Sequence, residues 1–152
     1  MSDSNENSLL GGLARGVAAG AIGTAAMTGA QTAYYKAVGA EPSDTPAEVG
    51  TRVVRGVLKR ELSEDDTSRL NNVMHWLYGT GWGALYGLTA AGREPGLGVG
   101  FALTVWGASQ VELPAMKLAP PPWESDLQTL APDVGFHVVY GVAVATAYKA
   151  LS

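Results

Sequence analysis

Two histidines and one glutamate are the residues of this chain whose types and positions suggest chemistry. His75, Glu112 and His137 each fall near the end of a separate apolar segment. An imidazole titrates near neutral pH, and a carboxyl group held away from water approaches the same range, so the trio could carry protons. Gln110 and Gln31 also lie near the ends of apolar segments. We therefore predict that the five residues together form a polar-solute or proton pathway.

Two imidazoles and a carboxylate are also a metal-binding set. Such ligands suit zinc or iron when one coordination position stays open. His75, His137 and Glu112 thus define an alternative hypothesis, an intramembrane metal enzyme. A third interpretation is structural, because polar side chains near helix ends also reach water, cap backbone groups or join helices by hydrogen bonds. The residue types alone leave these three alternatives open.

Long stretches without charge determine where these side chains lie. A helix rises about 1.5 Å per residue and needs about 20 residues to cross a bilayer core. Only 16% of the 152 residues are charged, well below the average for soluble domains, and the uncharged stretches approach the required length. The predicted fold is all-α, an integral membrane four-helix bundle in one domain over residues 1–152, with spans at about 13–35, 70–92, 95–116 and 133–150.

Consecutive spans run in opposite directions, so the sequence determines which span ends share a side of the membrane. The side that carries segment 36–69 is called the loop side here. His75, Glu112 and His137 come from three different spans and are predicted to lie at similar depth on the loop side. This side also carries more Lys and Arg than the other, which favours a cytoplasmic loop side with both termini outside.

A separate amphipathic helix is predicted at about 46–62, outside the spans. Val53 and Val57 belong to an apolar series at helical spacing, while basic residues project from other faces. Thr45 is expected to cap this helix, with Glu48 reaching back as its capping-box partner. We expect the helix to rest on the membrane surface or on the ends of the bundle.

Glycines recur at four-residue spacing in the first two spans. Gly16 and Gly20 share a face of the first, and Gly79, Gly83 and Gly87 share a face of the second. In lipid such GxxxG-type spacing lets two helix backbones approach closely. The pattern predicts tight helix packing within the chain, and a homo-oligomer interface is the alternative.

Composition narrows the class of protein further. The chain has no cysteine, which excludes disulfides and thiol chemistry, and its net charge of −4 argues against nucleic acid as a partner. No catalytic motif is recognisable, so a structural or accessory protein, or a proton-linked conduit, is favoured over an enzyme. The bilayer is the predicted partner, a homo-oligomer is possible, and the sequence specifies no cofactor. A soluble Ala/Gly-rich helical bundle is the remaining alternative.

Short motifs in the second half of the chain follow one another in a distinctive order. They are Asn72 and His75, the Tyr86-Gly87 pair, Pro114 and Leu118, Pro120-Pro121 with Trp123, and Gly135-Phe136-His137. Their order and spacing resemble those of the YagU-like family of small, uncharacterised bacterial inner-membrane proteins, although Glu112 departs from the family pattern. The resemblance implies a multi-pass protein of the plasma (inner) membrane and no established activity.

Overall fold

The computed structural model describes residues 2–41, 43–59, 63–90 and 98–152. Within these ranges the chain forms five α-helices and no strand, which confirms the all-α prediction. The helices are α1 (Ser2–Val38), α2 (Thr45–Leu58), α3 (Glu64–Ala90), α4 (Gly98–Ala115) and α5 (Leu127–Ala150), and a short 3-10 helix, η1 (Pro122–Glu124), precedes α5. They fall at the five predicted segments, although the limits predicted at 62, 92 and 95 lie outside the described residues.

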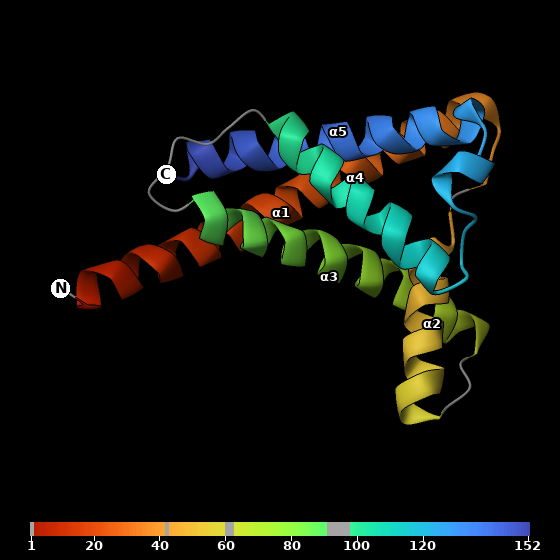
Figure 1. Ribbon diagram of the computed structural model, residues 1–152, viewed down its shortest axis with the longest axis horizontal. Coiled ribbons are helices and arrows are strands. Elements are labelled where there is room, and N and C mark those ends of the chain that lie inside the picture. The colour runs from red at the N-terminus through yellow and green to blue at the C-terminus, as the bar shows by residue number, and fades with distance from the viewer. Residues whose placement is uncertain (1, 42, 60–62, 91–97) are drawn as a thin grey trace.

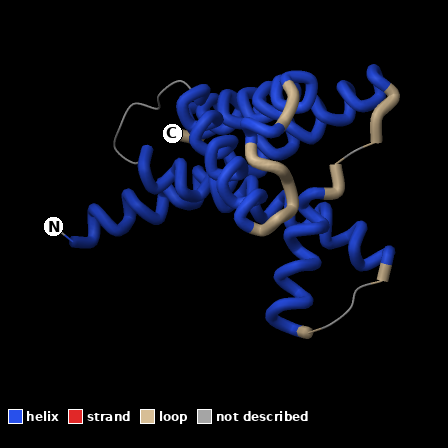
Figure 2. Tube along the Cα trace, turned by 45° about the vertical axis from the view of Figure 1, so that its right-hand side comes forward, coloured by secondary structure: helices blue, strands red, loops and turns tan. Residues whose placement is uncertain are grey.

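Three of the long helices, α1, α3 and α5, run along the length of the molecule, and α4 passes obliquely beside them (Figure 1). α1 packs against both α3 and α5, and α4 packs against α5. The shorter α2 packs against α3 at the loop side and runs crosswise to the other helices in both views (Figures 1 and 2). Both chain termini lie at the opposite end of the bundle (Figure 1).

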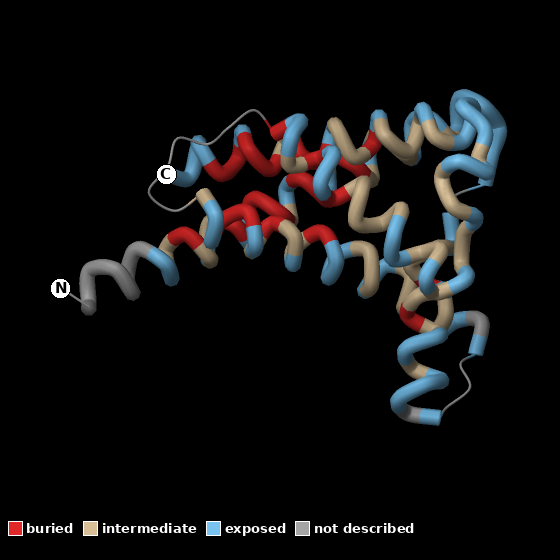
Figure 3. Tube along the Cα trace, viewed as in Figure 1, coloured by how far each residue is buried: buried red, intermediate tan, exposed pale blue. Residues whose placement is uncertain are grey.

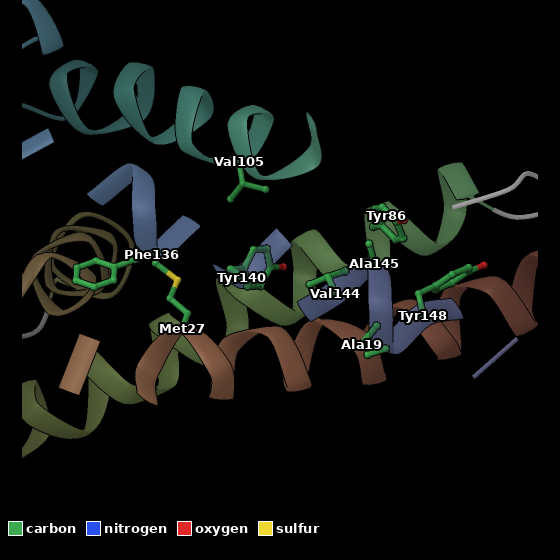
Figure 4. Close-up of a cluster of buried hydrophobic side chains, with 10 residues drawn as sticks. Ala19, Met27, Tyr86, Val105, Phe136, Tyr140, Val144, Ala145 and Tyr148 are labelled. Atoms are coloured by element: carbon green, nitrogen blue, oxygen red, sulfur yellow. The ribbon is translucent and has the colours of Figure 1, made fainter. Parts of the chain in front are cut away.

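The core lies where the four long helices meet, in the half of the bundle away from the loop side (Figure 3). Each of these helices contributes to one cluster of buried side chains, drawn in Figure 4. Ala19 comes from α1, Tyr86 from α3, Val105 from α4, and Tyr140 and Val144 from α5. Three of the ten buried residues in this cluster are tyrosines, and Gly23 on α1 leaves room for Tyr140.

The predicted glycines bring the backbones of α1 and α3 into direct contact. A methyl group placed on Gly20 would lie 2.9 Å from the Cα atom of Gly83, and one placed on Gly16 would lie 2.8 Å from the Cα atom of Gly87. Real Cβ atoms do not approach other atoms so closely. Gly79 faces the Thr24 side chain in the same interface. The two glycine series therefore face each other within a single chain, and any larger side chain would separate the helices.

A second close contact joins α4 to α5. A methyl group on Gly98 would lie 2.7 Å from the Cα atom of Val142, and one on Gly141 would lie 2.8 Å from the backbone nitrogen of Ala102. The sequence analysis did not single out Gly98 or Gly141. No other glycine lies four residues before or after either of them, so the GxxxG-type pattern did not mark them.

Several helix starts differ from the predictions. α1 begins at Ser2 rather than at about 13, and α3 begins at Glu64 rather than at about 70. α5 begins at Leu127 rather than at about 133, because Asp126 caps it and Pro132 is accommodated inside the helix. The predicted capping box at Thr45 is wrong. Thr45 is already helical, Asp44 takes the capping position, and its side chain makes no capping hydrogen bond.

Two helices in the described part of the chain are long and apolar enough to cross a membrane. They are α1, over Leu9–Val38, and α5, over Leu127–Ala150, and each has a window of mean hydropathy 1.3. This is weak evidence for a membrane location. The finding covers two of the four predicted spans, so the prediction of four spans is not confirmed.

Candidate functional site

His75 lies on α3 and contacts α1. The distance between its Nε2 atom and the Thr28 hydroxyl is 3.2 Å. The single hydroxyl proton of Thr28 is already donated to the carbonyl of Thr24, at 2.8 Å. The contact with Thr28 is therefore a hydrogen bond only when Nε2 of His75 carries the proton, which leaves Nδ1 of the neutral ring as an acceptor.

His137 lies on α5 and is held by Asp133, one helical turn earlier. Its Nδ1 atom is 2.8 Å from the Asp133 carbonyl and 3.4 Å from the Asp133 carboxylate atom Oδ1. Both partners are acceptors, so Nδ1 carries a proton and Nε2 is the free acceptor of the neutral ring. The His137 side chain is 12% exposed whereas that of Asp133 is 39% exposed. The carboxylate thus links a nearly buried imidazole to solvent.

Asp133 also joins α5 to α4. Its Oδ2 atom accepts a hydrogen bond from the indole nitrogen of Trp106 at 2.9 Å and one from the side-chain amide of Gln110 at 3.3 Å. Both donors are neutral, so they satisfy the carboxylate oxygen without bringing a positive charge to it. The predicted residue Gln110 therefore enters the site through Asp133.

These side chains form what we call the loop-side polar cluster. It consists of Thr28, His75, Trp106, Gln110, Asp133 and His137, which come from α1, α3, α4 and α5. Hydrogen bonds join Trp106, Gln110 and His137 to Asp133, and His75 contacts Thr28 separately. His75 and His137 are close enough for the charge on one ring to affect the other.

Glu112 is not part of this cluster. It lies exposed near the end of α4, where its Oε2 atom accepts a hydrogen bond from the Tyr78 hydroxyl at 3.0 Å. No group of three His, Asp or Glu side chains in the described part of the chain is placed to hold a metal ion. The set of His75, His137 and Glu112 is therefore not assembled, because Glu112 projects from α4 toward Tyr78 while the histidines lie toward α1 and α5.

Gln31 lies one turn beyond Thr28 on α1 and is half-buried. None of the hydrogen bonds found among the described residues includes its side chain. The structure thus brings together His75, His137 and Gln110 of the predicted pathway, and leaves Gln31 and Glu112 outside the cluster.

Sequence reasoning missed the central role of Asp133 and any role of Trp106. The signal for Asp133 was present, because it precedes His137 by four residues and so shares its helix face. Trp106 gave no such signal. It lies within an apolar segment, and only the packing of α4 against α5 aims its indole nitrogen at Asp133.

A separate groove lies between α2 and the start of α3. Its volume is about 1010 Å³ and it is open to solvent. Its lining is polar and carries both signs of charge, including Asp44, Glu48, Arg52, Thr67 and Asn71. The mixed charge does not select one class of ligand.

Comparisons of the chain with models of protein families, with curated proteins and with solved structures found no match. The resemblance to the YagU-like family therefore stays a prediction, and the function has to be argued from the residues and their geometry.

Proposed function

We propose that this protein is a small integral membrane protein of structural or accessory type, in which α1, α3, α4 and α5 cross the bilayer and α2 stays outside. The observation that carries the proposal is the exposure of the two helices that are long and apolar enough to cross a membrane. Only 33% of the apolar window is buried in α1 and likewise in α5. The core helices of a soluble bundle would bury most of such a window, whereas helices in lipid expose it.

Large apolar side chains project outward along all four long helices, where lipid would cover them. They include Leu9, Val17 and Ile22 on α1, Leu77, Leu85 and Leu88 on α3, Val99, Leu103 and Val111 on α4, and Val139 and Val142 on α5. The charged residues of α3 all precede Leu70, and Glu112 is the one charged residue of α4. Charge is therefore confined to the loop-side ends of these two helices, as a membrane span requires.

Threonine hydroxyls in the long helices are paired within their own helix. Each donates to the carbonyl one turn earlier, at 2.7–3.1 Å, in Thr24, Thr28, Thr32, Thr80, Thr89, Thr104 and Thr146. A polar group without a partner costs several kcal/mol in hydrocarbon. These hydroxyls can therefore face lipid without that cost.

Alkaline carbonate extraction of membranes from cells that express the full chain tests the proposal. We expect the protein to remain in the pellet and to be released by detergent, while a peripheral membrane protein is released by carbonate alone. Release of the chain itself by carbonate would support the soluble Ala/Gly-rich bundle and refute the four-span arrangement.

A second candidate function, a proton-linked role, is favoured by the loop-side polar cluster. Two imidazoles from different helices lie close to each other, and His137 contacts the Asp133 carboxylate, which reaches solvent. Histidine and acidic side chains in membrane spans often form proton relays. In the other half of the bundle, the hydroxyls of Tyr140 and Tyr148 donate to the carbonyls of Gly79 and Gly87. A carbonyl does not pass a proton on, so transfer across that half requires water or a rearrangement of these tyrosines.

Proton flux into liposomes that carry an internal pH-sensitive dye separates the two functions. A conduit predicts a flux that is lost in both His75→Ala and His137→Ala and kept in the exposed control Asn72→Ala. Flux no greater than that of protein-free liposomes would leave the structural or accessory role.

A further inference from the structure

One face of α2 is fixed on α3. The buried residues Ala47 and Gly50 lie on this face. The backbone nitrogen of Ala47 donates to the side-chain oxygen of Asn71 at 2.8 Å, and a methyl group on Gly50 would collide with Leu70 and Met74. The close packing holds α2 at one rotation about its own axis, so the directions of its other faces are also determined.

The two flanks of α2 differ in chemistry. Successive residues turn by about 100° around a helix, so Val53 and Val57 share one flank, and Arg52 shares the other with Glu48. Lys59 is the C-cap, in the left-handed conformation, directly after the last turn. Val53 is 49% exposed and Val57 is 73% exposed. Nothing in the described part of the chain covers this apolar flank.

The orientation of α2 matches a membrane surface. It lies at the loop side and runs crosswise to α1, α3 and α5 (Figures 1 and 2). If those helices cross the bilayer, α2 lies in the plane of the headgroups. This step rests on the function proposed above.

The charge of α2 favours an anionic surface. α2 carries Arg52 and Arg55 against one acidic residue, Glu48. Lys59 follows its last turn, so the helix and its C-cap are locally positive in a chain whose net charge is −4. A helix with an apolar flank and a basic flank binds where acyl chains and phosphates meet.

We propose that α2 docks onto the anionic lipid surface of the membrane that holds the bundle. Val53 and Val57 insert at the boundary of headgroups and acyl chains, and Arg52 and Lys59 contact lipid phosphates. The helix thereby fixes the depth of the loop side in the bilayer, and this depth depends on the charge of the lipids.

Spin labels on single cysteines test this docking, and the chain has no native cysteine to remove. The full chain is reconstituted in vesicles of phosphatidylcholine with phosphatidylglycerol. Labels in Val53→Cys and Val57→Cys are expected to collide several-fold more with oxygen than with a water-soluble nickel complex. Labels in Glu48→Cys and Gly56→Cys are matched controls on the same helix, and they are expected to show the reverse preference.

A second experiment tests whether the docking depends on lipid charge. The double change Arg52→Gln and Lys59→Gln is expected to reduce the insertion of a label at position 57 in vesicles that contain phosphatidylglycerol, with little effect in phosphatidylcholine alone. Lys149→Gln, at the far end of α5, removes a charge away from α2 and is expected to leave insertion unchanged. Equal insertion with and without phosphatidylglycerol would refute the preference for an anionic surface.

Labels on the spans distinguish failure of this inference from failure of the proposed function. Ile22→Cys and Val142→Cys, on α1 and α5, report whether the bundle is in lipid. If they are lipid-exposed and Val57→Cys is as water-exposed as Gly56→Cys, the docking proposal alone is refuted. If the labels on the spans are also water-exposed, the membrane protein proposal fails. Dipolar broadening between labels at position 57 on separate copies would show a protein contact and would also refute lipid docking.

Discussion

Three tyrosines place their hydroxyl groups in a largely apolar core, and their hydrogen bonding differs. Tyr140 on α5 is 2% exposed, and its hydroxyl donates to the carbonyl of Gly79 on α3 at 2.6 Å. Tyr148, two turns later, makes the same contact with Gly87 at 3.4 Å. The buried hydroxyl of Tyr86 has no hydrogen-bond partner among the described residues. Two of these three hydroxyls therefore stabilise the contact of α5 with α3, and the third is a cost.

Replacing each tyrosine by phenylalanine should separate these effects. Tyr140→Phe removes a short buried hydrogen bond and is expected to lower the free energy of unfolding by about 1 kcal/mol. Tyr86→Phe removes a hydroxyl that is already unpaired, so we expect unchanged or higher stability. Thermal unfolding of the detergent-purified variants measures both, and a larger loss in Tyr86→Phe than in Tyr140→Phe would contradict the hydrogen bonds described above.

Asp126 makes stability depend on pH at the start of α5. Hydrogen bonds from the side chain and the backbone nitrogen of Thr129 favour its charged form and lower its pKa. A pKa that is depressed in the folded state adds stability above the unfolded pKa, near 3.8, and that stability is lost as pH falls through the folded pKa.

Two substitutions test the role of this cap. Asp126→Ala removes both the cap and the charge and is expected to lower Tm at neutral pH, whereas Asp126→Asn keeps an acceptor for the backbone. The difference in Tm between wild type and Asp126→Ala should shrink in acid below the folded pKa. A difference that is independent of pH would show that the charge of Asp126 plays no part.

The sequence predicted part of the polar cluster and not its centre. His75 and His137 were predicted to lie at similar depth because alternating spans bring their helix ends to one side, and that argument needs no side-chain detail. It could not distinguish Asp133, which joins the cluster, from Glu112, which does not. That distinction depends on the rotation of each helix about its axis, and the rotation follows from packing of the whole bundle.

At the scale of helices, glycines determine which pairs come closest. The backbone nitrogen of Gly20 is 2.7 Å from where a methyl group on Gly83 would stand, so α1 and α3 touch at this point. Gly81, two residues away on the same helix, has nothing within 4 Å of such a methyl group. The two glycines are therefore a matched pair, one inside the interface and one facing outward.

Gly83→Leu is expected to destabilise the protein by about 1–3 kcal/mol or more, because overpacking forces α1 and α3 apart. Gly81→Leu adds the same side chain on an open face and should leave stability nearly unchanged or raised, since leucine is the better helix former. Thermal unfolding and oligomer size in detergent measure the effect. Unchanged stability together with a smaller oligomer in Gly83→Leu would instead assign this glycine to an interface between copies.

Helix positions were easier to predict from the sequence than helix limits. The long stretches without charged residues locate α1, α3, α4 and α5, because the length of such a stretch can be counted from the local sequence alone. The start of α5 was misplaced because the prediction followed uncharged length, which begins after Asp133. The helix itself extends back to Leu127, since a proline in the second turn costs one hydrogen bond and the Asp126 cap offsets part of that loss. The contact of Gly98 with Gly141 is tertiary, and no local pattern marks it.

At the scale of the whole molecule, both termini lie at one end and α2 lies at the other (Figure 1). An even number of crossings is consistent with this arrangement. On the predicted loop side are Lys36, Arg52, Arg55, Lys59, Arg60, Arg69 and Lys117, against Arg15, Arg93 and Lys149 on the other side. The excess of basic residues favours a loop side in the cytoplasm.

Single cysteines at the two ends of α1 test this topology, because one crossing separates them. A membrane-impermeant maleimide should label Ser2→Cys in intact cells, and should label Gly39→Cys only after the membrane is permeabilised. Gly39 is exposed and has nothing within 4 Å, so a cysteine there would be accessible once the reagent reaches its side. The reverse pattern would keep the span and invert the orientation, which would show that the charges on α2 face lipid on the outer side. Labelling of both positions in intact cells would mean that α1 does not cross, and the four-span proposal would fail at one of its two longest apolar helices.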